Sequence, residues 1–529
     1  MPILVRKEFD NCRDVYREVN PKYDPEITTR NLCVLGLASG WILSLLCIVG
    51  GSFIITSQDC IAPSEVQGKA FLISFSEWDL PPGAKNFPGH RILPLRPGLS
   101  ILLNLLLNLF VTTILDATNY IHDSTLRWVL HDEGRLRYNS NIRLFTSSRR
   151  HGPNSWYANV VSLLGLALTH GSLSTIVVNV VVIGTWNDKA NKFQFTPAET
   201  ADFIDINCFA VIFLGVGILL QACVSTCCLI CSRGVKTWSN SLLAIAKARS
   251  YDEKLNTESY TSPVLPNREI QSSMLDAAPQ VQFVRRLVWC FSGLFMAWSL
   301  GYGIYIAVKG YDMDNVVAWS QDVQQYWQFY GGTWMDYGRL LKSTPYWLGI
   351  MIQTILQSFI TFALHCVELL FKISRDEASW RCLQSTGSEI DPPILSNIQW
   401  QTMMMMTFKA VVQWAFGYAF TADETFNIAL LPAIALMGLF ICLMAATEYM
   451  VKKRPRGTLP ATYGAFDRVL ELVDEWDHKR LFWGDKGDLG DGTRLAGTAG
   501  RRLADLKPGA VYGCLDNRKA ITPPETSQD

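Results

Sequence analysis

Residues 206–232 read INCFAVIFLGVGILLQACVSTCCLICS, a stretch that contains no Asp, Glu, Lys or Arg. The hydrocarbon core of a bilayer is about 30 Å thick, and roughly 20 mostly apolar helical residues are needed to cross it. The stretch therefore predicts a transmembrane helix. Six further stretches are long enough and equally free of these four residue types: 32–56, 97–115, 157–186, 287–308, 344–367 and 426–447.

The composition of the whole chain supports an integral membrane protein. Apolar residues make up 49% of the 529 residues and charged residues only 18%, which is too apolar for a soluble chain of this length. The formal net charge is zero, and the basic residues flank the apolar stretches. Nucleic-acid binding is therefore not expected, and the lipid bilayer is the expected partner.

An eighth span is predicted over 403–420 from the distribution of basic residues. Lys and Arg are enriched in cytoplasmic connections. With eight spans, the connections on one side hold six, eight and three Lys or Arg, and those on the other side hold four, two, three and none. The N-terminal tail and the basic segment 452–456 then share the cytoplasmic side. The alternative is an interfacial helix over 403–420, an odd number of spans and an external tail.

The predicted fold is thus an all-α transmembrane bundle of eight spans with both termini in the cytoplasm. It comprises an N-terminal tail over 1–31, the bundle over 32–447 and a C-terminal tail over 448–529. The first apolar run is too long and too far from the N-terminus for a cleaved signal peptide, and is expected to act as an anchor. Lys409 is expected to extend its ammonium group to the cytoplasmic headgroups.

Polar side chains inside the spans form the candidate site. Each is costly in hydrocarbon unless it is paired or lines a cavity. Amides one turn apart commonly hold helices together, so that structural bonding is the favoured interpretation and a substrate pathway the alternative. The candidates are Asn104, Asn108, His170, Gln353 and Gln357, with Gln221, His365 and Gln413 as further buried polar groups.

The sequence gives no reason to expect an enzyme, a cofactor or a metal. None of the seven uncharged stretches holds a carboxylate, whereas ion-coupled transport usually needs one near the midplane; Asp116 and Glu368 lie just beyond them. No serine-hydrolase, zinc-protease or clustered-histidine motif occurs. Four cysteines lie near the end of one span, at 223, 227, 228 and 231, where core packing is favoured and palmitoylation of Cys228 or Cys231 is the alternative.

The soluble segments offer weaker signals. Apolar residues at helical spacing over 466–476 predict an amphipathic helix that docks on the inner face of the bundle or on the headgroups, and a cytoplasmic protein partner is the alternative. The segment 484–492 is rich in Gly and Asp but lacks the spacing of an EF-hand, and is interpreted as a flexible linker. Residues 250–280 are expected to form a loop. The aromatic connection between spans five and six is interpreted as interfacial, or as an external ligand platform.

Several blocks resemble one group of proteins. They are TLRWVL at 125–130, EGRLRYNSNIRL at 133–144, the segment 147–156, and RPRG, LVDEW and WGDKG at 454–457, 472–476 and 483–487. The chain resembles uncharacterised multi-span membrane proteins of filamentous fungi over most of its length. The resemblance implies no established activity. Some members are encoded near secondary-metabolite genes, which implies an export or accessory role.

Function is therefore predicted only in outline. A non-enzymatic structural, scaffold or sensing protein is favoured. A transporter or export accessory for a small amphiphilic metabolite is the first alternative, and an intramembrane enzyme the second. Transport predicts that the polar side chains converge on a water-accessible cavity, whereas a scaffold predicts a sealed bundle and a partner at the tail.

Overall fold

The computed structural model describes most of the chain in segments. They are residues 27–56, 70–72, 90–94, 97–136, 145–179, 182–187, 192–197, 203–231, 234–253, 272–309, 327–328, 345–390, 400–422, 426–428, 430–454, 457, 459–488 and 492–513. The N-terminal tail up to 26, most of the loop 250–280 and nearly all of the aromatic connection over 310–344 lie outside them.

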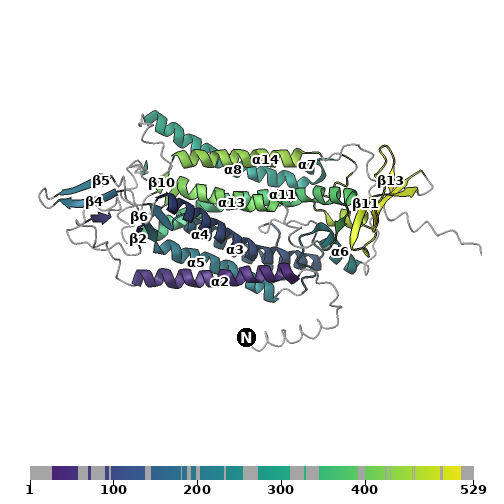
Figure 1. Ribbon diagram of the computed structural model, residues 1–529, viewed down its shortest axis with the longest axis horizontal. Coiled ribbons are helices and arrows are strands. Elements are labelled where there is room, and N and C mark those ends of the chain that lie inside the picture. The colour runs from purple at the N-terminus through teal and green to yellow at the C-terminus, as the bar shows by residue number, and fades with distance from the viewer. Residues whose placement is uncertain are drawn as a thin grey trace, which may run out of the picture.

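Long helices lie side by side and form an elongated bundle (Figure 1). Eight helices of the described segments have 18 residues or more, and each overlaps one predicted span. They are α2 (Ile27–Thr56), α3 (Pro97–Asp132), α4 (Trp156–Leu173), α5 (Cys208–Cys231), α8 (Pro279–Lys309), α11 (Pro345–Ser385), α13 (Trp400–Ala419) and α14 (Leu430–Lys452).

Six of these helices are long and apolar enough to cross a membrane: α2, α3, α5, α8, α11 and α14. Their outward faces carry large apolar side chains, as on α2, where exposed ones run from Leu32 to Phe53. At 1.5 Å per residue this belt is about 32 Å long, close to the thickness of the hydrocarbon core. The chain therefore has the architecture of a helical membrane bundle.

Short strands at one end of the molecule show that the fold is not purely α-helical. Three small sheets form there, with strand orders β1-β4-β5, β2-β6-β3 and β7-β10-β9. The strands are β1 (Ala70–Leu72), β2 (His90–Pro94), β3 (Val177–Asn179), β4 (Val182–Asn187), β5 (Lys192–Pro197), β6 (Phe203–Asn207), β7 (Trp327–Gln328), β9 (Phe420–Ala422) and β10 (Phe426–Ile428). We call this the strand end.

The strand end corrects the predicted boundaries of three spans. The helix predicted over 157–186 ends at Leu173, and those predicted from 206 and 426 begin at Cys208 and Leu430. The residues after Leu173 are rich in Val, Ile and Thr, whose branched side chains favour extended backbone. Hydropathy does not separate such a strand from a helix, because both are apolar.

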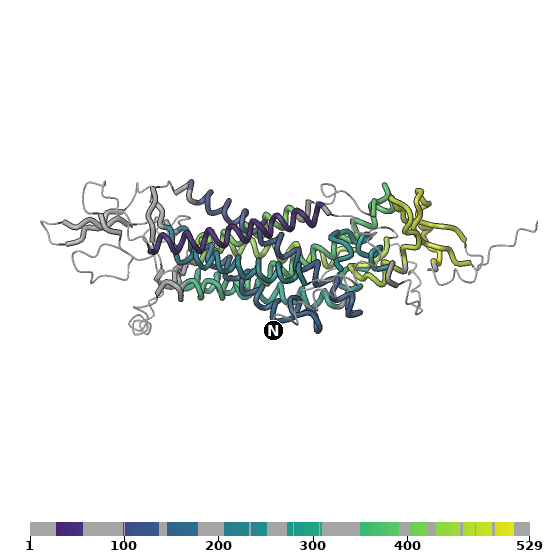
Figure 2. Tube along the Cα trace, turned by 90° about the horizontal axis from the view of Figure 1, so that it is seen from below, coloured from purple at the N-terminus to yellow at the C-terminus, as the bar shows by residue number. Residues whose placement is uncertain are grey.

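The opposite end carries a compact unit that we call the head. It contains α6 (Leu242–Glu253), α15 (Phe466–Leu472) and a four-stranded sheet in the order β13-β12-β11-β8. Its strands are β8 (Ser388–Glu389), β11 (Arg480–Asp488), β12 (Arg494–Ala499) and β13 (Tyr512–Gly513); the short helices η1 (Gly152–Asn154) and α7 (Met274–Ala277) also lie toward this side of the bundle. Figure 2 shows the head beyond the helices.

The head shortens one element predicted for the tail and overturns another. The amphipathic helix is present but ends at Leu472, and the first residues of the supposed linker over 484–492 belong to strand β11, which pairs with β12. Glycines at 484 and 497 face each other in this pairing. A Cβ at Gly484 would overlap the backbone oxygen of Ala504, so that these glycines permit close packing of the sheet rather than flexibility.

The two longest helices continue from the bundle into the head. The core of the head includes Leu126, Trp128 and Leu130 of α3 and Trp380 and Leu383 of α11. Trp380 meets Trp483 of β11 edge to face, with ring centroids 5.2 Å apart. The head is therefore built on the ends of two bundle helices and shares a core with them.

Candidate functional site

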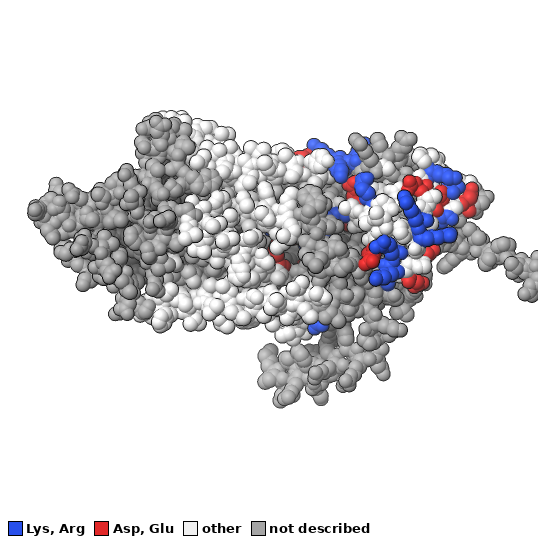
Figure 3. All heavy atoms as spheres, in the orientation of Figure 1, with Lys and Arg blue, Asp and Glu red and all other residues white. Residues whose placement is uncertain are grey.

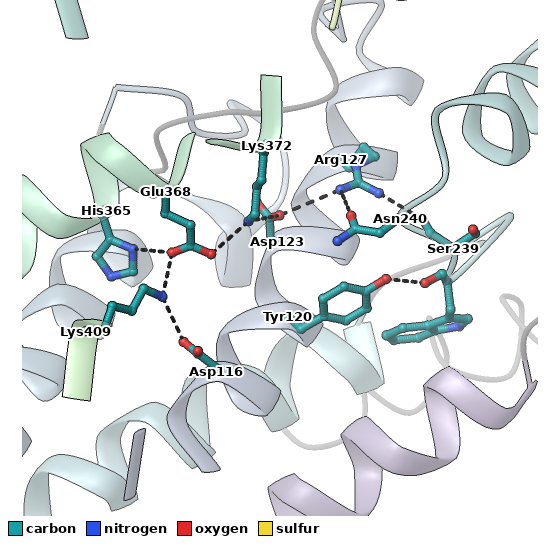
Figure 4. A network of polar contacts seen from close by, with 11 residues as sticks. Asp116, Tyr120, Asp123, Arg127, Ser239, Asn240, His365, Glu368, Lys372 and Lys409 are labelled. Atoms are coloured by element: carbon teal, nitrogen blue, oxygen red, sulfur yellow. Dashed lines mark hydrogen bonds and ion pairs between the residues drawn. The ribbon is translucent and has the colours of Figure 1, made fainter. Parts of the chain in front are cut away.

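Lys409 lies inside the bundle, where its ammonium group meets two carboxylates. Its side chain is only 9% exposed, and Nζ lies 2.7 Å from Glu368 Oε2 and 3.2 Å from Asp116 Oδ1 (Figure 4). The prediction that Lys409 reaches the headgroups is therefore wrong. A buried ammonium is stable only when paired, and α3 and α11 supply the two partners.

The ion pairs continue from this cluster toward the head. Glu368 Oε1 lies 3.3 Å from Lys372 Nζ, and Lys372 Nζ lies 3.7 Å from Asp123 Oδ2. Asp123 in turn lies 3.7 Å from Arg127, and His365 Nδ1 lies 3.4 Å from Glu368 Oε2. We call this set the ionic network: Asp116, Asp123, Arg127, His365, Glu368, Lys372 and Lys409.

Helical spacing explains why these side chains meet. Asp116, Asp123 and Arg127 recur at intervals of seven and four residues on α3, and His365, Glu368 and Lys372 at three and four on α11. Residues at such intervals share one face of a helix. The network holds three carboxylates and three cations besides His365, so its formal charge is zero when the histidine is neutral.

The network begins within the apolar belt and leaves it toward the head. Gly36 of α2 packs directly against Ala117, the neighbour of Asp116. Gly36 lies four residues from Leu32, the start of the exposed apolar run, which is about 6 Å along a helix. Asp116 therefore lies inside the belt, about one turn from its edge, where an unpaired charge is costly.

The head closes the other end of the network. Arg127 donates to the carbonyl oxygen of Ser239 at 3.4 Å and to Asn240 Oδ1 at 3.3 Å. Trp128 Nε1 donates to the Thr237 carbonyl at 3.0 Å, and the Tyr120 hydroxyl donates to the Trp238 carbonyl (Figure 4). The segment 237–240 between α5 and α6 is thus fixed by polar side chains from one face of α3.

The predicted site residues are all buried but do not form one cluster. Asn108 Nδ2 donates to the Asn104 carbonyl at 2.9 Å and to its Oδ1 at 3.2 Å, so that these two bond each other on α3. Gln353 Nε2 donates to Ser174 Oγ at 3.1 Å and to the Phe420 carbonyl at 2.7 Å. Gln353 thus joins the ends of two other helices, as the structural interpretation predicts, whereas the bonds between Asn104 and Asn108 stay within α3.

Gln357 and His170 differ from the other predicted residues. Both amide atoms of Gln357 and Nδ1 of His170 are buried and have no hydrogen-bond partner, and the Gln357 side chain is fully buried. Gly171, next to His170, packs against Thr354 of α11, which places His170 beside that helix. Gln413, a third buried amide, donates to Thr361 Oγ1 at 3.4 Å.

Sequence reasoning missed the ionic network because the carboxylates lie outside the uncharged stretches. Helices α3 and α11 continue past those stretches without a break, to Asp132 and Ser385. Two signals were present in the sequence. Lys409 lies within a span and requires a buried carboxylate, and the charged residues after 115 and after 367 keep the helical spacing of the apolar runs before them.

The cysteines of α5 do not form a site. Cys228 is fully buried and its thiol donates to the Pro153 carbonyl at 3.3 Å, so it is not available for palmitoylation, whereas Cys231 is exposed. Within the described segments no group of three or more His, Cys, Asp or Glu could hold a metal ion.

Comparison of the chain with protein-family models, with curated proteins and with solved structures gives no match.

Proposed function

We propose that this protein has a non-enzymatic structural, scaffold or sensing role, in which a membrane bundle displays the head to a cytoplasmic protein partner. One observation carries the proposal. Helices α3 and α11 run from the apolar belt into the core of the head, and the ionic network ties them to α13 and to segment 237–240. A rigid connection of this kind suits a protein that positions or switches its head.

The proposed topology has eight crossings, with α4 and α13 crossing beside the six strongly apolar helices. Both helices pack within the bundle: α4 lies against α5 and α11, and α13 against α3 and α14. On the face shown in Figure 3, the described charged residues gather at the head, and the middle of the bundle is nearly free of them. The positive-inside rule then favours a cytoplasmic head and cytoplasmic termini.

Close helix contacts support a sealed bundle. A Cβ at Gly171 would lie 2.7 Å from Thr354 Oγ1, one at Gly217 would lie 2.8 Å from the Thr169 backbone nitrogen, and one at Gly417 would lie 2.7 Å from Ser174 Cβ. Small residues allow membrane helices to approach this closely. Such contacts leave little room for an amphiphilic metabolite between α4, α5, α11 and α13.

A transporter or export accessory for a small amphiphilic metabolite is the second candidate. The unpartnered amide of Gln357 favours it, because a buried polar group without a partner is typical of a substrate path. The chain resembles membrane proteins of filamentous fungi, some of which are encoded beside secondary-metabolite genes. Membership of this group would agree with a role in export.

Proximity labelling from the C-terminus, combined with metabolite profiling of cells and medium, separates the two candidates. The scaffold role predicts a reproducible set of labelled cytoplasmic proteins that is lost when Trp483→Ala opens the core of the head. The control Val511→Ala should leave the set of labelled proteins unchanged, because this side chain of the head is 43% exposed. No labelled partner, together with a compound retained in deletion cells, would instead establish transport.

A further inference from the structure

Polar side chains follow one face of α11 through the whole apolar belt. Gln353, Gln357, Thr361, His365, Glu368 and Lys372 recur every three or four residues. From first to last they cover about 28 Å at 1.5 Å per residue, close to the thickness of the hydrocarbon core. We call this face, with the polar groups of α4 and α13 that meet it, the polar column.

Bonds link the column at both ends. Toward the strand end, Gln353 joins Ser174, the residue after α4, to the Phe420 carbonyl after α13. Toward the head, Glu368 pairs with His365, Lys372 and Lys409. Between them, Gln413 bonds Thr361. Three helices thus contribute polar groups at successive levels of the column.

The middle of the column holds polar atoms that no protein group satisfies. They are Gln353 Oε1, Gln357 Oε1 and Nε2, Gln413 Oε1 and His170 Nδ1. Their four side chains are at most 6% exposed. Leaving a buried donor or acceptor unsatisfied costs about 1–3 kcal/mol, so binding of small polar ligands to these atoms is favoured.

The size of that ligand is limited by the packing. Gly171 against Thr354 and Gly417 against Ser174 bring α4, α11 and α13 into backbone contact beside these atoms. Water is the smallest ligand that can both donate to the amide oxygens and accept from Gln357 Nε2. A larger solute would have to separate the helices.

We propose that the polar column is a proton path, in which water bound by Gln353, Gln357, Gln413 and His170 carries protons to the His365–Glu368 pair. This inference goes beyond the proposed function and does not depend on a partner of the head. Lys372 from α11 and Lys409 from α13 contact the pair, and His170 from α4 interacts with His365. Behind the two lysines lie Asp123 and Asp116 from α3, and Arg127 pairs with Asp123.

The chemistry is a sequence of proton transfers. An O–H bond of a hydronium ion breaks as an N–H bond forms on the His365 imidazole. When the proton moves on, that N–H bond breaks and an O–H bond forms on a Glu368 oxygen or on a water molecule toward the head. No group is oxidised or reduced. The close contacts of Gly171 with Thr354 and of Gly417 with Ser174 exclude solutes larger than water and so restrict the path to protons.

A liposome assay with the purified full-length chain tests the path. The liposomes hold a pH-sensitive dye, and valinomycin with a potassium gradient drives protons inward. We expect acidification faster than in protein-free liposomes, loss of that excess in Gln357→Leu, and full retention in Gln384→Leu. Gln384 lies on α11 beyond the column, where its side chain bonds Asp505 in the head.

Further controls keep the result decisive. Each variant is used only after it shows the thermal unfolding of the unmodified protein, and Gln413→Leu serves as a second block if Gln357→Leu does not fold. Acidification equal to that of protein-free liposomes would overturn the proposal. So would excess flux that persists in both folded variants, or collapse of the potential without acidification, which would indicate a leak for other cations.

Discussion

At the scale of the residue, Lys409 decides whether the bundle can keep two carboxylates in its apolar belt. The network is formally neutral only while this ammonium is present. Removing one partner of a buried ion pair costs about 3–5 kcal/mol, because the remaining charge is left uncompensated. Exposed pairs contribute about 0–1 kcal/mol. The pairs of Lys409 and of Lys452 are an example of each kind and allow a direct comparison.

Lys409→Met should lower the free energy of unfolding by about 3–5 kcal/mol, because Asp116 loses its ammonium partner and Glu368 keeps only Lys372 and His365. Thermal unfolding of the purified protein in detergent measures the change. The control is Lys452→Met, whose partner Glu448 lies 2.8 Å away but whose side chain is 61% exposed; it should change stability little. Equal effects of the two substitutions would show that Lys409 is not buried in this pairing.

The same residues show how far sequence reasoning reaches at this scale. The sequence located the buried amides and Lys409, because each interrupts an apolar run. It did not identify their partners. The partners of Lys409 lie 293 and 41 residues away in the chain, and only the packing of α3 and α11 against α13 brings them together.

At the scale of the element, helix contacts depend on glycine. A Cβ at Gly171 of α4 would lie 2.7 Å from Thr354 Oγ1 and 2.8 Å from its Cα, whereas one at Gly293 of α8 would meet nothing within 4 Å. The first position therefore requires the absence of a side chain. The second does not.

Gly171→Ala should lower the free energy of unfolding by about 1–3 kcal/mol, because the methyl group forces α4 away from α11. Gly293→Ala is the matched control and should be neutral or stabilising by up to about 1 kcal/mol, since alanine is the better helix former. Thermal unfolding compares the two. If alanine is tolerated equally at both positions, the contact between α4 and α11 is looser than described.

In the head, Asp485 of β11 joins three segments. It accepts hydrogen bonds from Arg494 Nε at 2.7 Å, the Gly487 N–H at 2.9 Å and the Tyr512 hydroxyl at 3.1 Å. Burial alone would raise the pKa of Asp485, but these hydrogen bonds outweigh it and lower the pKa below its usual range. The ionised form therefore stabilises the folded head.

A lowered carboxyl pKa gives stability that is present above the unfolded pKa, about 3.9, and is lost as the pH falls through the lower folded value. Amide exchange in β11 and β12, corrected for the intrinsic rate at each pH, should therefore lose protection below about pH 4. Asp485→Asn should reduce the protection of these amides at neutral pH and make their protection depend less on pH below about pH 4. Asp477→Asn, at an exposed position, should leave the profile unchanged; an unchanged profile in Asp485→Asn would contradict the role given to its carboxylate.

Sequence reasoning located the long helices of the described segments and missed the strands for a physical reason. An apolar run of 18 or more residues is too long for a strand of a small sheet, so it can be assigned to a helix from its length. The strands after α4 are short and apolar, and β11 is rich in glycine and aspartate, which strands usually avoid. Its stability comes from contacts with β12, β13 and α11 that have no local signal.

At the scale of the whole molecule, the bundle and the head form a single elongated body (Figures 1 and 2). The apolar belt lies on the helices, and on the face shown in Figure 3 most of the described charged residues gather at the head. A membrane therefore encloses the middle of the molecule and leaves the head in water. Eight crossings place the head on the side of the N-terminus, whereas an odd number would separate them.

The most direct test of this account is the location of the two termini. A split fluorescent reporter is fused to the N-terminus in one protein and to the C-terminus in another, and its complement is expressed in the cytosol. In the proposed eight-span topology α4 and α13 both cross and the number of spans is even, so we expect fluorescence from both fusions. Fluorescence from only one fusion would contradict this topology, because an odd number of crossings leaves one of the two weakly apolar helices, α4 or α13, outside the membrane.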